Sequence, residues 1–167
     1  MAIHKIIYLP DPRLRKVSKP IEQFDEKLQQ LIDDMFETMY QANGVGLAAP
    51  QIGINIRLSV IDIIGDKKDQ LVLINPEIIA KEGEVQYQEG CLSIPGVYES
   101  VTRAEHVTIR AQNAKGEFFE KSGKGVLGEC FQHEIDHLNG KLMVDLLSPL
   151  KREIARRKLA KHLRSRK

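Results

Sequence analysis

The hydrophobic positions after Asp25 repeat at the spacing of an α-helix. Seven apolar side chains follow this spacing without a break: Leu28, Leu31, Ile32, Met35, Phe36, Met39 and Tyr40. Asp25 is a suitable N-cap residue, and Asn43-Gly44 ends the pattern. The pattern predicts an amphipathic helix that packs its apolar stripe on the core, and we assign this stripe no chemistry.

A second helical pattern carries apolar residues on two sides. The first stripe consists of Val126, Cys130, His133 and His137, and the second of Leu127, Phe131, Ile135 and Leu138. Asn139-Gly140 ends the pattern, which predicts a helix over about Gly125–Leu138. A helix covered on two sides is central to its fold, and histidines there are costly to bury unless a partner satisfies them.

Beyond Gly53 the helical spacing gives way to short β-rich runs separated by glycine, asparagine and proline. The predicted strands are Arg57–Ile63, Leu71–Asn75, Ile78–Ala80, Val85–Gln88, Val107–Ala111 and Glu117–Lys121, with a hairpin turn at 113–116. Residues 6–20, interrupted by three prolines, predict an extended arm with at most one helical turn. Because regular βαβ alternation is missing, the fold class is α+β: antiparallel β-sheets around the central helix, with a C-terminal helix over about 148–165.

Length and composition indicate one domain over residues 1–167. The chain has 42% hydrophobic and 29% charged residues, which is ordinary globular composition. No apolar run approaches the roughly 20 residues of a membrane span, and the first residues lack the apolar region of a secretory signal. We therefore expect a cytoplasmic protein without membrane contact, whose two cysteines are free thiols or metal ligands.

Residues 132–137 read Gln-His-Glu-Ile-Asp-His, which places His133 and His137 one turn apart on one helix face. Two ring nitrogens can hold one divalent ion at about 2.0–2.1 Å each, while Glu134 remains free to act on water. This arrangement is typical of metal-assisted hydrolysis and makes the central helix a metal-binding one. The alternative is a solvated polar helix with a chance pair of histidines, which the two apolar stripes disfavour.

A metal site of this kind needs a third ligand. The extended pattern of one metalloprotease group requires a histidine where Met143 stands. A later glutamate, Glu153, lies among basic residues typical of a solvated face. Cys130 shares the helix with both histidines, and three ligands along about 10 Å of one straight helix cannot converge on one ion. Cys91, in an extended segment that enters a Pro-Gly turn, remains as the candidate.

Three motifs occur in order along the chain: Gly44-Val45-Gly46-Leu47-Ala48-Ala49-Pro50-Gln51, Glu89-Gly90-Cys91-Leu92-Ser93 and the motif at 132–137. Together with residues 9–15 they resemble the signature motifs of peptide deformylases, and the similarity spans nearly the whole chain. The resemblance implies a metal-dependent hydrolase that removes the N-formyl group from the initiator methionine of nascent polypeptides and releases formate. The implied metal ligands are Cys91, His133 and His137.

The resemblance also implies the catalytic roles. Glu134 takes a proton from the attacking water and delivers it to the departing amine. The Gln51 amide and the backbone N–H of Leu92 hold the developing oxyanion. The implied pocket for the methionine side chain consists of Val45, Gly46, Tyr87, Glu89, Gly90, Val126 and Cys130. For Val126 and Cys130 a plain core role is an alternative.

One salt bridge and the three remaining histidines complete the set of candidate polar residues. The resemblance implies that Asp136 pairs with Arg103 and fixes the helix, as in similar proteins. The alternative is that Asp136 forms a generic surface salt bridge. His4, His106 and His162 have no ligand-like spacing, and we expect them at the surface.

The ligand types and the resemblance indicate different metals. One thiolate and two imidazoles suit Zn²⁺, and the affinity order of divalent ions also favours zinc over iron. The resemblance implies one Fe²⁺ per chain, which zinc, nickel or cobalt can replace. We expect iron, on grounds of the resemblance alone.

The C-terminal segment is strongly basic. From Lys151 onwards nine basic residues face one glutamate, for a net charge of +8, so the rest of the chain carries −6. Such a segment suits an RNA surface, although a solvated helix face is the common case. Because deformylases act on chains leaving the ribosome, we hypothesise that this helix docks there. We expect a monomer whose hydrolysis of small formyl peptides survives deletion of the residues after Lys151.

Two other function classes compete with this interpretation. A small zinc peptidase would use the same histidines and Glu134 but cleave internal amide bonds. An RNA-binding module without catalysis would rest on the basic segment alone and leave Cys91 and the helix motif without purpose.

Overall fold

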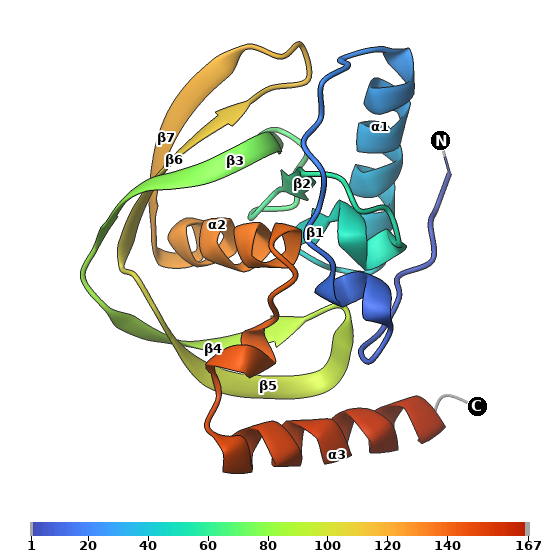
Figure 1. Ribbon diagram of the computed structural model, residues 1–167, viewed down its shortest axis with the longest axis vertical. Coiled ribbons are helices and arrows are strands. Elements are labelled where there is room, and N and C mark those ends of the chain that lie inside the picture. The colour runs from blue at the N-terminus through green and yellow to red at the C-terminus, as the bar shows by residue number, and fades with distance from the viewer. Residues whose placement is uncertain (1, 166–167) are drawn as a thin grey trace.

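A central helix, α2 (Gly125–Leu138), runs through the middle of the molecule between two antiparallel sheets (Figure 1). The computed structural model describes residues 2–165. Phe131 and Ile135 pack against Leu73, Val107 and Ile109 of the larger sheet, in one of three hydrophobic clusters. The predicted helix therefore has the predicted bounds, and both of its sides are covered.

The larger sheet has five strands in the order β1-β2-β3-β6-β7, and every neighbouring pair is antiparallel. Its strands are β1 (Gly46–Ala48), β2 (Leu58–Ile61), β3 (Leu71–Glu82), β6 (His106–Gln112) and β7 (Phe118–Lys124). The smaller sheet is a hairpin of β4 (Val85–Cys91) and β5 (Ile94–Arg103). The two sheets and three α-helices confirm the α+β class.

Helix α1 (Glu26–Gln41) packs on the sheet beside β1 and β2. Asp25 caps it, because the Asp25 carboxylate accepts a hydrogen bond from the Leu28 N–H at 3.0 Å. The predicted apolar stripe joins a core cluster with Leu47, Leu58 and Ile74, as expected for a helix without a chemical role.

The remaining helices are short 3₁₀ turns and one long helix. The turns are η1 (Pro12–Arg15), η2 (Ala49–Ile52) and η3 (Met143–Leu146). Helix α3 (Pro149–Ser165) lies along β5, and Ala155 and Leu159 are buried there against Ile94 and Val97. Because α3 covers the hairpin of β4 and β5, it supports the strand that carries Cys91.

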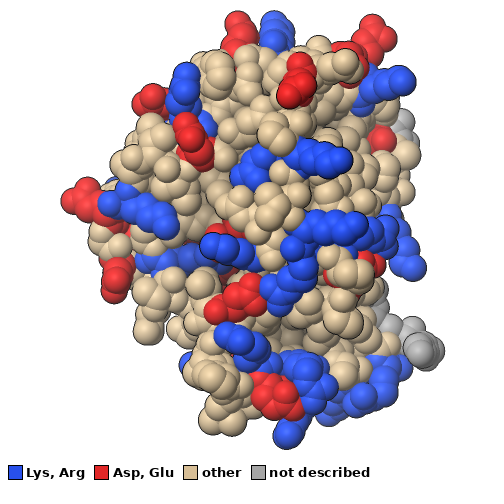
Figure 2. All heavy atoms as spheres, in the orientation of Figure 1, with Lys and Arg blue, Asp and Glu red and all other residues tan. Residues whose placement is uncertain are grey.

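The solvent face of α3 is basic. In Figure 2, Lys and Arg gather along the lower edge of the molecule, where α3 lies in Figure 1. All seven described basic residues of this face are exposed: Lys151, Arg152, Arg156, Arg157, Lys158, Lys161 and Arg164. Arg166 and Lys167, which also count toward the predicted charge, lie outside the described residues. No helix within residues 2–165 is both long enough and apolar enough to cross a membrane.

Three strand predictions were wrong or incomplete. The runs 71–75 and 78–80 form one strand, β3, which continues through an irregularity at Asn75-Pro76. Strands β1 and β5 were not predicted. These differences affect the site directly, because β5 pairs with the strand that carries Cys91 and β1 borders the cavity described below.

Candidate metal centre

The hairpin of β4 and β5 brings Cys91 to the central helix. Cys91 ends β4 and pairs with Ile94, after a register shift that follows Gly90. A side chain at Gly90 would meet the Tyr98 ring, because a Cβ built there lies 2.5 Å from the nearest ring carbon. The Tyr98 ring therefore lies directly over Gly90, and a side chain at this position would have to displace the ring.

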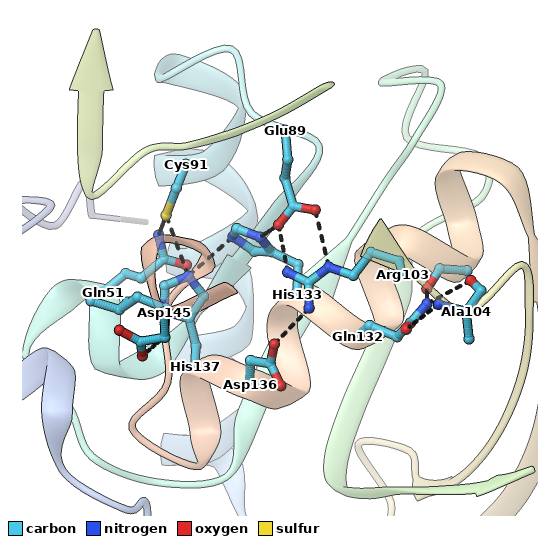
Figure 3. Close-up of polar contacts among 12 residues, drawn as sticks. Gln51, Glu89, Cys91, Arg103, Ala104, Gln132, His133, Asp136, His137 and Asp145 are labelled. Carbon is cyan, nitrogen blue, oxygen red and sulfur yellow. Dashed lines mark hydrogen bonds and ion pairs between the residues drawn. The ribbon is translucent and has the colours of Figure 1, made fainter. Parts of the chain in front are cut away.

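The three predicted ligands converge (Figure 3). The Nε2 atoms of His133 and His137 lie 3.1 Å apart, and the Cys91 Sγ atom lies 3.4 Å from Nε2 of His137. Ligand atoms from the three residues all lie within 4.8 Å of one another. The structure thus brings together a thiol from the hairpin and two imidazoles from one helix face.

The two shorter separations, 3.1 and 3.4 Å, are close to those around a single metal ion. Bonds of about 2.0–2.3 Å to a tetrahedral ion would hold the ligand atoms roughly 3.3–3.7 Å apart. Within the described residues, the buried Nδ1 atom of His137 has no hydrogen-bond partner. Burial, followed by the charge of His133, lowers the pKa of His137 well below its ordinary value. The neutral imidazole is the form that binds a metal.

A buried carboxylate fixes the orientation of His133. The Nδ1–H of His133 donates to Glu89 at 2.5 Å, which turns the Nε2 atom of His133 towards Nε2 of His137, 3.1 Å away. Arg103 donates to the same carboxylate at 2.6 and 3.1 Å and to Asp136 at 2.6 Å. The predicted pair of Arg103 and Asp136 is confirmed, and it forms part of a buried network.

The same network explains the ionisation of Glu89. Burial alone would raise the pKa of Glu89, but the hydrogen bonds from His133 and Arg103 outweigh burial and lower the pKa to about 2. Glu89 is therefore charged at neutral pH and compensated by the Arg103 guanidinium. Its structural task is to hold the imidazole ring of His133.

Gln51 lies on η2 with its amide directed at Cys91. Its Oε1 accepts the Ala48 N–H at 2.9 Å, so the NH₂ group points the other way. That NH₂ group donates to the Ser93 hydroxyl at 3.1 Å and lies 3.7 Å from the Cys91 sulfur. The amide is held as a donor on the thiol side of the cluster.

Glu134 lies beside the ligands and is not held by the network. Its Oε1 atom is buried and has no hydrogen-bond partner among residues 2–165. Burial raises the pKa of Glu134 to about 7. Its other oxygen lies against β1, where a Cβ at Gly46 would come within 2.6 Å of Oε2. Gly46 therefore makes room for the carboxylate, which is poised near neutral pH to accept a proton.

A cavity of about 570 Å³ opens onto this cluster. Most predicted site residues line it: Val45, Gly46, Gln51, Glu89, Gly90, Cys91, Leu92, Val126, Cys130, His133 and Glu134. His137 and Tyr87 do not line it. Tyr87 lies two residues before Glu89 on β4.

Several lining residues were not predicted from the sequence. Glu129 lies one helical turn before His133, and Tyr98 comes from the unpredicted strand β5. His162 of α3, expected at the surface, is half-buried and also lines the cavity. It packs against Gly96, where an added Cβ would lie 2.9 Å from its Nδ1 atom.

Comparison with known proteins relates the whole chain to one group. The family model described as polypeptide deformylase matches residues 3–153. A peptide deformylase of Hahella chejuensis is 56% identical over 158 residues, which cover 94% of each chain. The crystal structure of a peptide deformylase from Legionella pneumophila superposes with a TM-score of 0.96 at 64% identity and covers 99% of both chains. A peptide deformylase from Synechococcus elongatus, solved in complex with actinonin, gives a TM-score of 0.89 at 45% identity and covers 93% of this chain and 86% of its own.

Proposed function

Because the chain belongs to the peptide deformylase family, we propose that the cavity at Cys91, His133 and His137 is its active site. The enzyme removes the N-formyl group from the initiator methionine of nascent polypeptides. The observation that carries the proposal is the convergence of the three ligand atoms within 4.8 Å, beside the unpaired Glu134 carboxylate.

The thiol and the two imidazoles of this site support a metal cofactor. When bound, a divalent ion lowers the pKa of a water molecule and polarises a carbonyl oxygen. Cys91, His133 and His137 would hold this ion, and Glu89 and Arg103 keep the His133 ring in the orientation that binding requires. Three protein ligands are typical of a catalytic site, because one position stays open.

Glu134 serves as the general base and then as the general acid. Its pKa of about 7 allows it to take the proton of the attacking water near neutral pH. The protonated carboxyl then delivers this proton to the nitrogen of the departing amine. Formate and a peptide with a free amino terminus result. The unpaired Oε1 atom is available for both transfers.

Gln51 and Leu92 stabilise the oxyanion. The Gln51 NH₂ group is held on the thiol side of the cluster, because the Gln51 carbonyl accepts a hydrogen bond from the Ala48 N–H. The backbone N–H of Leu92 follows the ligand Cys91 directly, in the turn of the hairpin. Two fixed donors beside the reacting carbonyl favour the charge that develops in the transition state.

The methionine side chain enters the apolar part of the cavity. Val45, Val126 and Cys130 supply its walls, while Gly46 and Gly90 let the peptide backbone approach. Tyr87, which does not line the cavity, is proposed for this pocket on the family motifs alone.

Four further properties are proposed from the family. The native ion is Fe²⁺, which zinc, nickel or cobalt can replace, although the ligand set and the affinity order of divalent ions favour zinc. Residues 1–167 form one domain that acts as a monomer in the cytoplasm, where formylated nascent chains are its substrates.

The basic face of α3 docks on the ribosome. Its seven described cations are exposed, and among residues 2–165 their ion pairs are with Glu153 and Glu99. One-signed charge along an exposed helix attracts the phosphate backbone of RNA.

Formate release under anaerobic conditions tests the proposed reaction. Protein purified without oxygen should release formate and a new amine from formyl-Met-Ala-Ser, contain about one metal ion per chain, and leave casein intact. Cys91→Ala should lose both metal and activity. A metal-free protein that still deformylates the peptide, or one that cleaves casein instead, would contradict the proposal.

A further inference from the structure

One face of α2 forms a continuous wall of the cavity. Val126, Glu129, Cys130 and His133 follow the spacing i, i+3, i+4 and i+7, and all four line the cavity. Val126 and Cys130 are apolar, and His133 belongs to the metal site. Glu129 therefore places a carboxyl group in the wall that would otherwise suit an apolar side chain.

The Glu129 carboxyl group differs from the other two acids of the cavity. Glu89 is compensated by Arg103, and Glu134 is the proposed general base. Among residues 2–165, no Lys, Arg or His side chain forms an ion pair with Glu129. Within the chain, Glu129 shares a hydrogen bond with Glu89 and feels the charges of His133 and Arg103 only at a distance. A ligand that brings a cation into the cavity would therefore give this half-buried carboxyl group a direct ion pair.

The surroundings of Glu129 add negative charge. Burial, followed by the charge of Glu89, raises the pKa of Glu129 to about 7. The thioether side chain of methionine offers this carboxyl group no cation, so the charge of Glu129 does not contribute to methionine binding. An ammonium group beside Glu129 would be attracted both by Glu129 and by Glu89, which lies within hydrogen-bond distance of Glu129.

We propose that Glu129 is a specificity-determining residue that lets the cavity accept formyl peptides whose first side chain is an extended aliphatic chain ending in a cation, in addition to methionine. The inference rests on the proposed function, because it assigns the α2 wall to the first side chain. A lysine stem is unbranched like methionine and can lie along Val126 and Cys130. Its ammonium group extends beyond the length of methionine and reaches the carboxylate.

Selectivity between two substrates tests this inference. kcat/KM is measured for formyl-Lys-Ala-Ser and formyl-Met-Ala-Ser at pH 8, where Glu129 is largely ionised. In Glu129→Gln, which keeps the shape and removes the charge, we expect the lysyl-to-methionyl ratio to fall about tenfold. The matched control is Glu105→Gln, because Glu105 is exposed and lies outside the cavity. We expect this control to keep the wild-type ratio within about twofold.

The outcomes separate the inference from the proposed function. The inference is overturned if the lysyl-to-methionyl ratio of Glu129→Gln stays within twofold of the wild-type ratio, or if the ratio of the control falls equally. In either case, hydrolysis of the methionyl peptide still supports the proposed reaction. If the wild type with metal bound releases formate from neither peptide, the proposed function and the inference are overturned together. Metal content is measured in every variant, so that loss of the ion is not mistaken for a change in selectivity.

Discussion

At the scale of single residues, local spacing explains which parts of the site the sequence predicts. A helix fixes His133 and His137 on one face whatever surrounds them, and Glu129 follows the same spacing from Val126 and Cys130. That spacing could have identified Glu129 as a lining residue. His162 gave no such signal, because its place in the cavity depends on how α3 crosses the turn at Gly96.

The general base gives the most direct prediction at this scale. Glu134→Gln keeps the size of the side chain but removes the proton acceptor, so we expect kcat to fall by about 10²–10⁴-fold. Metal content should stay near that of the wild type, because the ligand set is unchanged. Anaerobic formate assays and metal analysis on the same sample measure both quantities. Retention of more than a tenth of the wild-type kcat would rule out this role.

At the scale of elements, two strands show why pairing was harder to predict than helices. Asn75-Pro76 normally ends a strand, but Asn75 adopts a positive φ of 50° at an irregularity and β3 continues beyond it. In β5 the alternation is hidden by Pro95-Gly96 at one end and by a buried arginine, Arg103, at the other. The partners Glu89 and Asp136 explain why an arginine points inward here, and neither contact is local in sequence.

The loop after β2 is organised by one buried carboxylate, Asp62. Tyr40 donates to it at 2.5 Å, and the backbone N–H groups of Gly65 and Lys67 donate to it at 2.9 and 3.0 Å. Asp62→Asn loses one acceptor oxygen for these donors. We expect the free energy of unfolding at pH 7 to fall by about 1–3 kcal/mol. Urea denaturation of the wild type and the variant measures this difference.

The stability difference at Asp62 should depend on pH. Burial would raise the pKa of Asp62, but the hydrogen bonds from Tyr40, Gly65 and Lys67 outweigh burial and lower the pKa below its ordinary value of 3.8. The ionised form is therefore favoured by folding, and its contribution is complete above the unfolded pKa. It is lost as the pH falls through the lower folded pKa. The gap between wild type and Asp62→Asn should stay constant near neutral pH and narrow below about pH 4. A constant gap down to pH 2.5 would contradict this account.

Helix α3 should contribute to stability through its inner face. Leu159 is 4% exposed and packs against the hairpin of β4 and β5, whereas Leu150 on the same helix is 72% exposed. We expect Leu159→Ala to lower the free energy of unfolding by about 2–4 kcal/mol. Leu150→Ala, the matched control, should change it by less than about 0.5 kcal/mol. Equal effects in the two variants would show that α3 does not pack as described.

At the scale of the whole molecule, this packing changes how ribosome docking can be tested. The sequence alone suggested that residues after Lys151 could be deleted without loss of hydrolysis. The deletion would also remove Ala155 and Leu159 from the core and His162 from the cavity wall. Loss of activity in the deletion would therefore say nothing about docking. Substitutions confined to the solvent face of α3 avoid this problem.

Charge reversal on α3 isolates the docking surface. Arg157, Lys161 and Arg164 are exposed, so their joint replacement by Glu should leave the core intact and keep kcat/KM for formyl-Met-Ala-Ser within about twofold. Ribosome co-sedimentation at low salt should fall at least tenfold, with a weaker dependence on salt, because fewer phosphates are neutralised. The control reverses three exposed cations on other elements, Lys68, Lys115 and Lys121, and so matches the change in net charge. If both triple variants lose co-sedimentation equally, overall charge rather than α3 attracts the ribosome.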